Sequence, residues 1–211
     1  KDSAGGPMSS YVQGVSRQAS PPRLMGALVV WDGLFSPSEL DAIVAHGDAM
    51  RLAEAQVANR DGSGYNAVRV TRVGWFERPA APEWIFSRLE DAVLRLNSQF
   101  FRYDLSALLN PQYAVYDAGE KGHFDWHQDY GRDATDPSRE PRKLTISVQL
   151  SEADAYDGCE FQAQGSHTVD IAPRTRGTLI AFPSYVLHRV TPATRGQRKS
   201  LVGWAVGPDL R

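Results

Sequence analysis

The second half of this chain constrains the fold more than any other feature, because it breaks into short β-type runs separated by Gly, Pro and Asp. Beyond Asn110 the runs cover residues 112–116, 122–127, 144–150, 159–162, 168–171, 178–182, 187–191 and 199–206. Short strands with frequent turn residues are typical of antiparallel sandwiches and barrels and not of parallel α/β sheets. The 18 Gly and 13 Pro in 211 residues also disfavour a helical bundle. We therefore predict a mainly β (α+β) chain with a sandwich or jelly-roll core.

Two helices are predicted in the first half. Ser36 and Glu39 form a capping box with Pro at the first helical position, and an apolar face follows to about Met50. A second apolar stripe at helical spacing predicts a helix over residues 82–97, and residues 66–76 between the two have strand composition. Both helices should pack on the outside of one sheet.

Composition excludes several classes of protein. Hydrophobic residues make up 42% of the chain and charged residues 23%, which rules out a disordered chain, and no apolar run is long enough to span a membrane. A net charge of −2 argues against a dedicated nucleic-acid binder. The single cysteine, Cys159, excludes an internal disulfide and a Cys-built zinc site. Motifs for phosphate binding, dinucleotide binding and serine hydrolysis are missing from the sequence.

The ends of the domain are expected as follows. Residues 1–7 resemble an expression scar, and residues 1–23 are predicted to be a flexible N-terminal segment. Residues 24–211 then form one domain, with helical support over 24–110 and the β core over 111–207. The polar N-terminal segment has no secretory signature, so we expect a cytoplasmic protein.

Two histidines and a carboxylate suggest a metal site. His127 and Asp129 are two residues apart at the end of a predicted strand, and strand alternation places both on one face. His188 lies on another predicted strand. Two His and one carboxylate form the facial triad that holds non-haem Fe(II) and leaves three coordination positions open. His123 and Asp125 are a rival pair on the same strand face, whereas His46 and His167 are expected to be ordinary surface residues.

Arg198 opens the last strand, ten residues after His188. An Arg can hold a carboxylate bidentately, and Ser200 shares its strand face and adds a hydroxyl. Lys199 should point to the opposite face and be solvated. These residues predict an anchor for a carboxylate ligand beside the metal site.

At this point the sequence resembles the Fe(II)/2-oxoglutarate-dependent dioxygenases of the prolyl-4-hydroxylase-like type. The resemblance depends on Tyr-x-x-Gly at residues 116–119, Phe-x-Trp-His-x-Asp at 124–129, the run 143–151, Tyr-Asp-Gly-Cys-Glu-Phe at 156–161, and His-Arg-Val-Thr-Pro-x-x-x-Gly-x-Arg-x-Ser at 188–200. It covers roughly residues 112–206. It implies a double-stranded β-helix (jelly roll, cupin-like) with N-terminal supporting helices.

The resemblance also implies roles for individual residues. The iron ligands would be His127, Asp129 and His188, and Arg198 would pair with the distal carboxylate of 2-oxoglutarate. Two further positions, Tyr116 and Gln149, match side chains that can reach the co-substrate, and Ser200 adds its hydroxyl. The cofactors are then Fe(II), 2-oxoglutarate and O₂, with ascorbate as a candidate auxiliary. Cys159 stands where the family usually has a Gly, on what we expect to be a strand edge.

The reaction implied is hydroxylation of an unactivated C–H bond with release of succinate and CO₂. The substrate would be a peptidyl residue such as proline, a free amino acid or a small natural product, with no membrane partner. Two alternatives stay open: a nucleic-acid-modifying dioxygenase, which the charge balance disfavours, and a non-catalytic cupin-like metal-binding module. Arg198 discriminates against the second, because a pure metal site needs no carboxylate anchor.

Some candidate pocket residues stay undecided by sequence. Trp204 shares the face of Arg198 and could floor the pocket or belong to the core, and His123 and Asp125 could line it. The polar segment 131–142 leaves directly from Asp129 and carries three arginines, namely Arg132, Arg139 and Arg142. It is either a solvated loop or a lid that orders over substrate.

Overall fold

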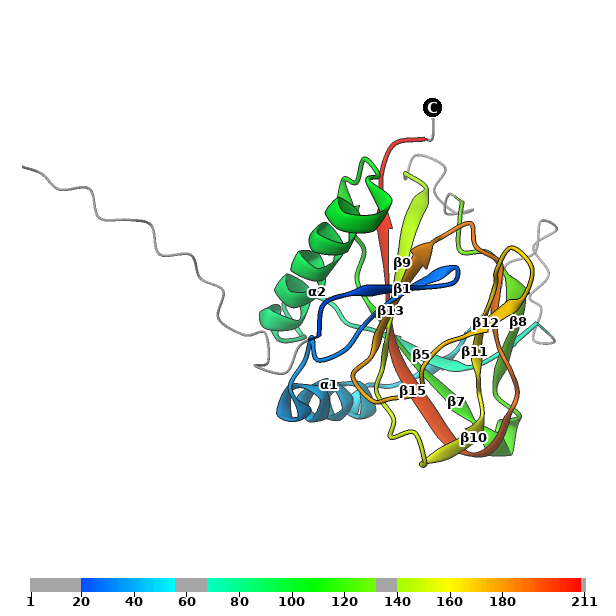
Figure 1. Ribbon diagram of the computed structural model, residues 1–211. Helices are drawn as coiled ribbons and strands as arrows, with labels where there is room; N and C mark the ends of the chain where they lie inside the picture. The colour runs from blue at the N-terminus through cyan, green and yellow to red at the C-terminus, as the bar shows by residue number, and fades with distance from the viewer. Residues whose placement is uncertain (1–19, 56–67, 132–139, 210–211) are drawn as a thin grey trace, which may run out of the picture.

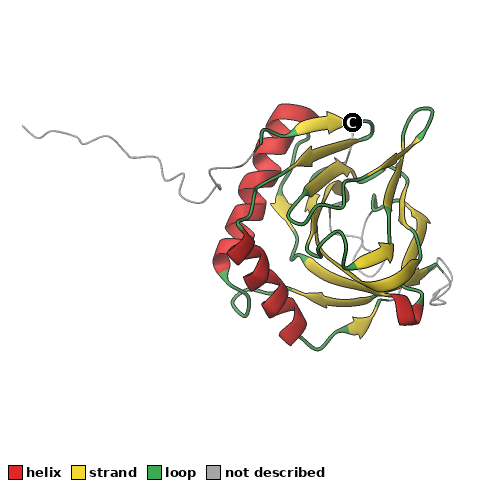
Figure 2. Cartoon of the chain, turned by 60° about the horizontal axis from the view of Figure 1, so that its bottom comes forward, coloured by secondary structure: helices red, strands yellow, loops and turns green. Residues whose placement is uncertain are grey.

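A computed structural model of the chain describes residues 20–55, 68–131 and 140–209 (Figure 1). Within these ranges two antiparallel sheets face each other, with two helices along the outside of the larger one (Figure 2). The larger sheet has the strand order β1-β2-β13-β9-β15-β7-β5-β3, and β6 and β10 also pair with β15. Its strands are β1 (Arg23–Met25), β2 (Leu28–Trp31), β3 (Ala53–Glu54), β5 (Arg72–Trp75), β6 (Ala107–Leu108), β7 (Gln112–Asp117), β9 (Arg142–Gln149), β10 (Tyr156–Gly158), β13 (Leu179–Pro183) and β15 (Ala193–Val206).

The smaller sheet has the order β12-β11-β14-β8-β4 and closes over the inner face of the larger one. Its strands are β4 (Arg69–Val70), β8 (His123–His127), β11 (Phe161–Gln164), β12 (Val169–Ile171) and β14 (His188–Val190). The predicted fold class is confirmed: two facing antiparallel sheets with external helices make a double-stranded β-helix.

Both predicted helices are confirmed. The first, α1 (Pro37–Ala49), begins with the capping box, in which the Glu39 amide donates to Ser36 Oγ at 3.2 Å and the Ser36 amide donates to Glu39 Oε2 at 2.8 Å. The second, α2 (Glu83–Leu96), buries one stripe and continues into a single π-helical turn, Asn97–Phe101. None of the described helices is long and apolar enough to cross a membrane.

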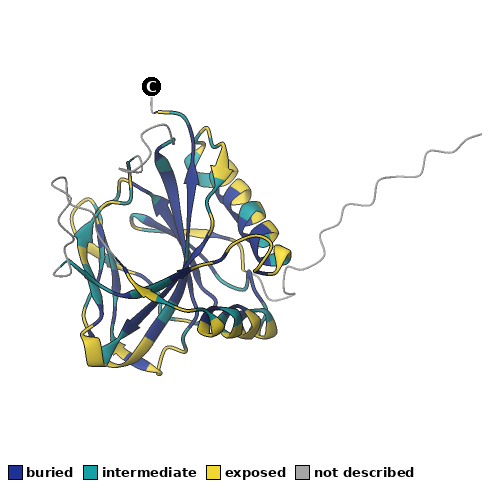
Figure 3. Cartoon of the chain, turned by 180° about the vertical axis from the view of Figure 1, so that it is seen from behind, coloured by how far each residue is buried: buried dark blue, intermediate teal, exposed yellow. Residues whose placement is uncertain are grey.

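The larger sheet separates two buried regions. The helix-side core lies between that sheet and the helices, and includes Leu144, Ile146 and Val148 of β9 with Leu40 of α1 and Leu89 of α2. Strand alternation turns the intervening β9 residues the other way, into the space between the sheets. We call this space the inter-sheet interior. The central strands of the larger sheet are almost wholly buried, while the outer helix faces are exposed (Figure 3).

The inter-sheet interior is partly polar. Its apolar part includes Phe161, Ile180 and Phe182. The β9 residues Thr145, Ser147 and Gln149 are at most 3% exposed, and so are Arg198 and Ser200 of β15. Buried polar groups cost free energy unless they are satisfied, so their concentration on one face of two neighbouring strands marks a binding site.

The structure departs from the expectations at several positions. The segment 24–110, expected as helical support, also contributes β2 and β5 to the larger sheet. Cys159 is not on a strand and has a positive φ of 49°. It directly follows Gly158, where any side chain would collide with the Pro192 carbonyl oxygen. Lys199 is only partly solvated: its side chain is 21% exposed, and its ammonium forms an ion pair with Asp48 at 2.7 Å. The division of the chain into N-terminal segment, support and core stays a prediction, since residues 1–19 lie outside the described ranges.

Candidate active site

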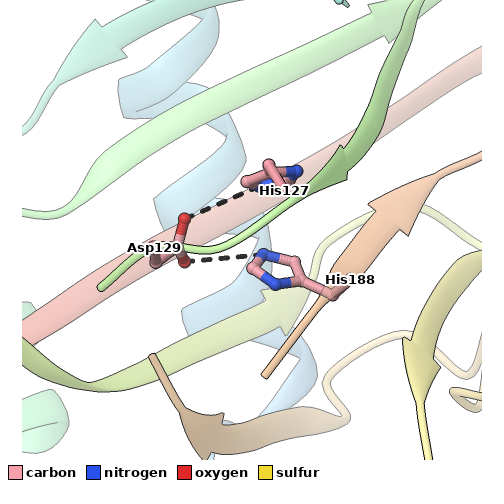
Figure 4. A group of neighbouring side chains, drawn as sticks. All are labelled: His127, Asp129 and His188. Carbon is pink, nitrogen blue, oxygen red and sulfur yellow. Dashed lines mark ion pairs between the residues drawn. The ribbon is translucent and has the colours of Figure 1, made fainter. Parts of the chain in front are cut away.

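Three side chains converge at one end of the inter-sheet interior (Figure 4). His127 Nε2 lies 3.6 Å from Asp129 Oδ1, and His188 Nε2 lies 3.5 Å from Asp129 Oδ2. One candidate ligand atom from each residue fits within a mutual separation of 4.8 Å. Among the described residues this is the one cluster of three or more His, Cys, Asp or Glu close enough to hold a metal ion.

Strand pairing brings these residues together. His188 of β14 is the direct cross-strand partner of His127 of β8, and their ring centroids are 4.1 Å apart. Asp129 lies two residues beyond the end of β8, and its amide donates to the Ser184 carbonyl at 2.9 Å. The Tyr130 amide donates to the same carbonyl at 2.8 Å, so two hydrogen bonds fix the chain that carries the carboxylate.

The hydrogen bonds of the two imidazoles determine which nitrogen faces the cluster. His127 Nδ1 lies 2.7 Å from the Asp125 carbonyl, and His188 Nδ1 lies 2.8 Å from the Val186 carbonyl. A carbonyl oxygen only accepts, so Nδ1 carries the proton in both rings and donates it. Each ring therefore directs its Nε2 toward Asp129, the orientation that metal-ligating histidines have.

Burial and charge set the protonation states in the cluster. Burial lowers the pKa of His188 to about 4, which outweighs the opposing effect of the Asp129 carboxylate and keeps the ring neutral. Burial alone raises the pKa of Asp129, but His127, His188 and the Trp204 indole outweigh it and hold the pKa well below its usual range. At neutral pH the cluster thus contains an ionised Asp129 carboxylate and a neutral His188 ring.

These donors suit Fe(II). Two imidazoles and one carboxylate form the facial set typical of non-haem iron oxygenases, and imidazole–carboxylate sites leave room for further ligands on the metal. The three side chains are between 5% and 15% exposed, so one side of the cluster remains accessible. The cluster faces a cavity of about 440 Å³, into which such ligands can enter.

Arg198 lies in the same cavity and is 1% exposed. Its Nε donates to Gln149 Oε1 at 3.1 Å, its guanidinium lies 5.5 Å from the centre of the Tyr116 ring, and its Nη2 is buried without a hydrogen-bond partner among the described residues. A buried guanidinium with an unsatisfied N–H is costly unless an anion binds it. Arg198 and Ser200 therefore fit the carboxylate of 2-oxoglutarate, which chelates a metal through its other end.

The rival metal pair is not supported. His123 and Asp125 lie on β8 but do not line the cavity: His123 Nδ1 is 2.8 Å from the Lys121 carbonyl, and Asp125 is exposed and caps the Trp126 amide. His46 packs edge-on against Phe76, and His167 is exposed.

Trp204 lines the cavity, which answers one question that the sequence left open. Arg142 also lines it, with its guanidinium 4.3 Å from the centre of the Trp204 ring. Residues 132–139, including Arg132 and Arg139, lie outside the described ranges, so the idea that 131–142 is a lid stays a prediction.

Sequence reasoning missed one residue that supports the cluster and two that line the cavity. The Ser184 carbonyl, directly after β13, accepts from the Asp129 amide and its hydroxyl contacts Thr145, yet a serine after a strand carries no local signal. Arg69 and Trp75 come from the first half of the chain and line the outer part of the cavity. Only the pairing of β4 with β8 and of β5 with β7 places them there.

Comparison with known proteins agrees with this geometry. The profile of the 2OG-Fe(II) oxygenase superfamily matches residues 111–206, which include His127, Asp129, His188 and Arg198. The matched segment makes up slightly less than half of the chain. The described fold also resembles solved structures: a Pseudomonas putida prolyl-4-hydroxylase (TM-score 0.67, 22% identity, 87% of this chain and 94% of that one) and a Trichoplax adhaerens prolyl hydroxylase in complex with a peptide fragment of hypoxia inducible factor (TM-score 0.69, 15% identity, 86% and 84%).

The sequence is also similar to parts of proteins named PKHD-type hydroxylases. The Shewanella oneidensis protein is 32% identical over 94 residues, which are 44% of this chain and 41% of that protein. The Pseudomonas putida protein is 32% identical over 87 residues, 40% of this chain and 38% of that protein. The chain thus spans about two fifths of the length of the curated relatives it matches. Members of the superfamily use Fe(II), 2-oxoglutarate and O₂, which supports the predicted cofactors.

Proposed function

We propose that this chain is an Fe(II)/2-oxoglutarate-dependent hydroxylase with His127, Asp129 and His188 as the iron ligands. The proposal depends on one observation: the three cluster residues and Arg198 line the same cavity, and Arg198 Nη2 is buried there without a hydrogen-bond partner among the described residues. A metal-binding module without turnover has no need of a buried guanidinium that lacks an anion. When bound, Fe(II) and 2-oxoglutarate supply an O₂-dependent oxidation that inserts one oxygen atom into a substrate C–H bond and releases succinate and CO₂.

The chain's own residues bind, orient and exclude water. Arg198 holds the distal carboxylate of 2-oxoglutarate with charge-assisted hydrogen bonds, and the Ser200 hydroxyl adds a donor beside it. Gln149 orients the guanidinium by accepting from its Nε, and Tyr116 covers its face. The apolar walls keep water away from the reacting atoms, which strengthens these polar contacts; they include Phe161, Phe182, Val190 and Trp204.

We propose a peptidyl residue, with proline as the first candidate, as the substrate class. Support comes from the solved neighbours, which are described as prolyl hydroxylases, one of them holding a peptide. Three aromatic side chains and two guanidiniums line the outer cavity, namely Trp75, Tyr130, Trp204, Arg69 and Arg142. The aromatic rings can contact the ring of a proline, and the guanidiniums can donate to the carbonyls of a peptide. Free amino acids and small natural products are the other classes to test.

The test is Fe(II)-dependent release of succinate from 2-oxoglutarate, screened with proline-containing peptides, free amino acids and small natural products. We expect a basal uncoupled rate that one class of substrate stimulates, and we expect His127→Ala, Asp129→Ala and His188→Ala to reduce turnover to background. The matched control is His123→Ala, which removes a histidine of the same strand outside the cavity and should keep wild-type rates. Loss of iron binding in His123→Ala and Asp125→Ala with retention in His127→Ala would overturn the ligand assignment.

A further inference from the structure

The hydrogen bonds to the two oxygens of the Asp129 carboxylate are unequal. Oδ2 accepts from Trp204 Nε1 at 2.9 Å and from Thr145 Oγ1 at 2.9 Å. Each oxygen also faces one imidazole, because His127 Nε2 lies 3.6 Å from Oδ1 and His188 Nε2 lies 3.5 Å from Oδ2. Among the described residues, no hydrogen bond within 3.5 Å reaches Oδ1. A carboxylate oxygen has two lone-pair sites, so the two donors occupy Oδ2 and leave Oδ1 available.

The register of the larger sheet creates this arrangement. Trp204 of β15 and Thr145 of β9 are direct cross-strand partners, and both side chains point into the inter-sheet interior. They are 5% and 1% exposed, so neither can turn to water for another partner. The two donors thus reach Asp129 from adjacent central strands, the least mobile support that the fold offers.

Neighbouring groups hold both donors in place. The Thr145 hydroxyl also lies 2.9 Å from Ser184 Oγ. Because an ionised carboxylate only accepts, Thr145 donates to Asp129 and therefore accepts from Ser184. The Trp204 ring is fixed between the Arg142 guanidinium, 4.3 Å from its centre, and the Trp75 ring at 5.9 Å.

We propose that Trp204 and Thr145 are positioning residues that restrict Asp129 to a single metal-ligating oxygen, Oδ1. The inference rests on the proposed function and extends it. If both oxygens bound the metal, the carboxylate would use two coordination positions and one fewer would remain for 2-oxoglutarate and O₂. With Oδ2 engaged by two donors, the three protein ligands use three positions only. Partners of this kind also tune affinity, and their loss typically costs about 10–100-fold in metal binding or activity.

The test uses Mn(II) as a probe for the metal and the anaerobic Fe(II)–2-oxoglutarate complex as a spectroscopic probe. Trp204→Phe keeps an aromatic ring and removes the N–H, and Thr145→Val keeps the shape and removes the hydroxyl. We expect each variant to raise the Kd for Mn(II) about tenfold and to shift the visible charge-transfer absorption of the Fe(II)–2-oxoglutarate complex at saturating metal. A merely structural defect would lower thermal stability without shifting that absorption in the folded fraction.

Two controls complete the test. Thr145→Ser retains the hydroxyl and should restore the wild-type Kd and absorption. Trp84→Phe changes an indole of α2 that packs against the helix-side core and does not line the cavity, and should leave both unchanged. Wild-type Mn(II) affinity and an unshifted absorption in both Trp204→Phe and Thr145→Val would overturn the positioning role while leaving the proposed function intact. Failure of the unmodified protein to bind Mn(II) would instead overturn the proposed function and this inference with it.

Discussion

The two faces of β9 lie in equally buried surroundings and have opposite chemistry. On the helix side, Leu144, Ile146 and Val148 are no more than 1% exposed and contact only apolar neighbours of the helix-side core. On the other side, Thr145 and Ser147 are just as buried, yet they face a cavity that also contains Arg198 and the His–Asp–His cluster. Burial alone therefore does not distinguish the core from the site in this molecule.

The difference shows where stability and function reside. Apolar burial contributes about 25 cal/mol per Å² to folding. In the helix-side core, the larger sheet and the helices both bury apolar side chains and both gain this contribution. The inter-sheet interior keeps buried groups that cost free energy in the absence of a ligand, including the unpartnered Nη2 of Arg198. We infer that the first region holds the fold together and that the second exists to bind ligands. The following predictions test this division, from the largest expected effect to the smallest.

The largest effect is expected from a substitution on the helix-side core. Ile146→Ala creates a cavity beneath the helices and should lower the free energy of unfolding by about 2–5 kcal/mol, measured by urea denaturation. Below the melting temperature, its Kd for Fe(II) should be that of the wild type. The matched control is Ser147→Ala on the next residue, which faces the cavity and should cost less than about 1 kcal/mol. Equal losses in the two variants would contradict the division.

A substitution of Arg198, the proposed anchor for 2-oxoglutarate, should weaken ligand binding and leave the free energy of unfolding nearly unchanged. Arg198→Lys loses the guanidinium fork, which costs about 1.5–3 kcal/mol, so the apparent KM for 2-oxoglutarate should rise by at least about tenfold while iron affinity barely changes. The control is Lys199→Met, which removes the adjacent cation on the opposite face. An unaltered KM in Arg198→Lys, or a raised one in Lys199→Met, would show that another group anchors the co-substrate.

The same anchor gives a stability prediction of opposite sign to that for Ile146. Arg198→Met replaces a buried guanidinium by an apolar chain of similar length, a kind of exchange that is often neutral or stabilising. In the ligand-free protein we expect the free energy of unfolding to stay the same or to rise by about 1 kcal/mol in thermal and urea denaturation. A loss of more than about 2 kcal/mol would mean that Arg198 is part of what stabilises the fold.

The smallest effect on the free energy of unfolding is expected for Asp48, a charged residue at the helix side of the larger sheet. Asp48 accepts from the Tyr113 hydroxyl at 2.7 Å and pairs with Lys199, and these hydrogen bonds outweigh the effect of burial and hold its pKa below the usual range. A depressed carboxyl pKa stabilises the folded state above the unfolded-state value of about 3.9 and loses this contribution as the pH falls through the folded-state value. The Asp48 side chain is 45% exposed, so the pair is worth less than about 1 kcal/mol.

Asp48→Asn should accordingly lower the free energy of unfolding slightly at pH 7, and the difference from the wild type should shrink toward zero at low pH. Urea denaturation of both proteins between pH 2.5 and pH 7 measures this, with exposed Asp41→Asn as a comparison from the same helix. A difference that grows as the pH falls would have the wrong sign for the pair.

The sequence was informative where local patterns decide the structure. The capping box at Ser36 and the apolar stripe of α2 are properties of neighbouring residues, and both predictions are confirmed. The convergence of His127, Asp129 and His188 agrees with the motif spacing, because a shared strand end and one β14–β8 pair are enough to bring them together.

Long-range pairing decides what the sequence left out. Arg69 and Trp75 reach the cavity, and Ser184 reaches Asp129, through strand pairs that join segments far apart in the chain. No local pattern marks these three residues. The resemblance predicted a strand edge at Cys159, whereas the chain leaves β10 there with a positive φ at Gly158 and at Cys159. The ion pair of Lys199 was not predicted, because its partner, Asp48, is 151 positions away.

The most direct test of the central claim is a crystal structure of the chain grown with Mn(II) and 2-oxoglutarate, with an anomalous-difference map at the manganese edge. The account predicts one strong peak bonded to His127 Nε2, His188 Nε2 and one oxygen of Asp129, with the distal carboxylate of 2-oxoglutarate on Arg198. A peak at His123 and Asp125, or a co-substrate carboxylate away from Arg198, would contradict it.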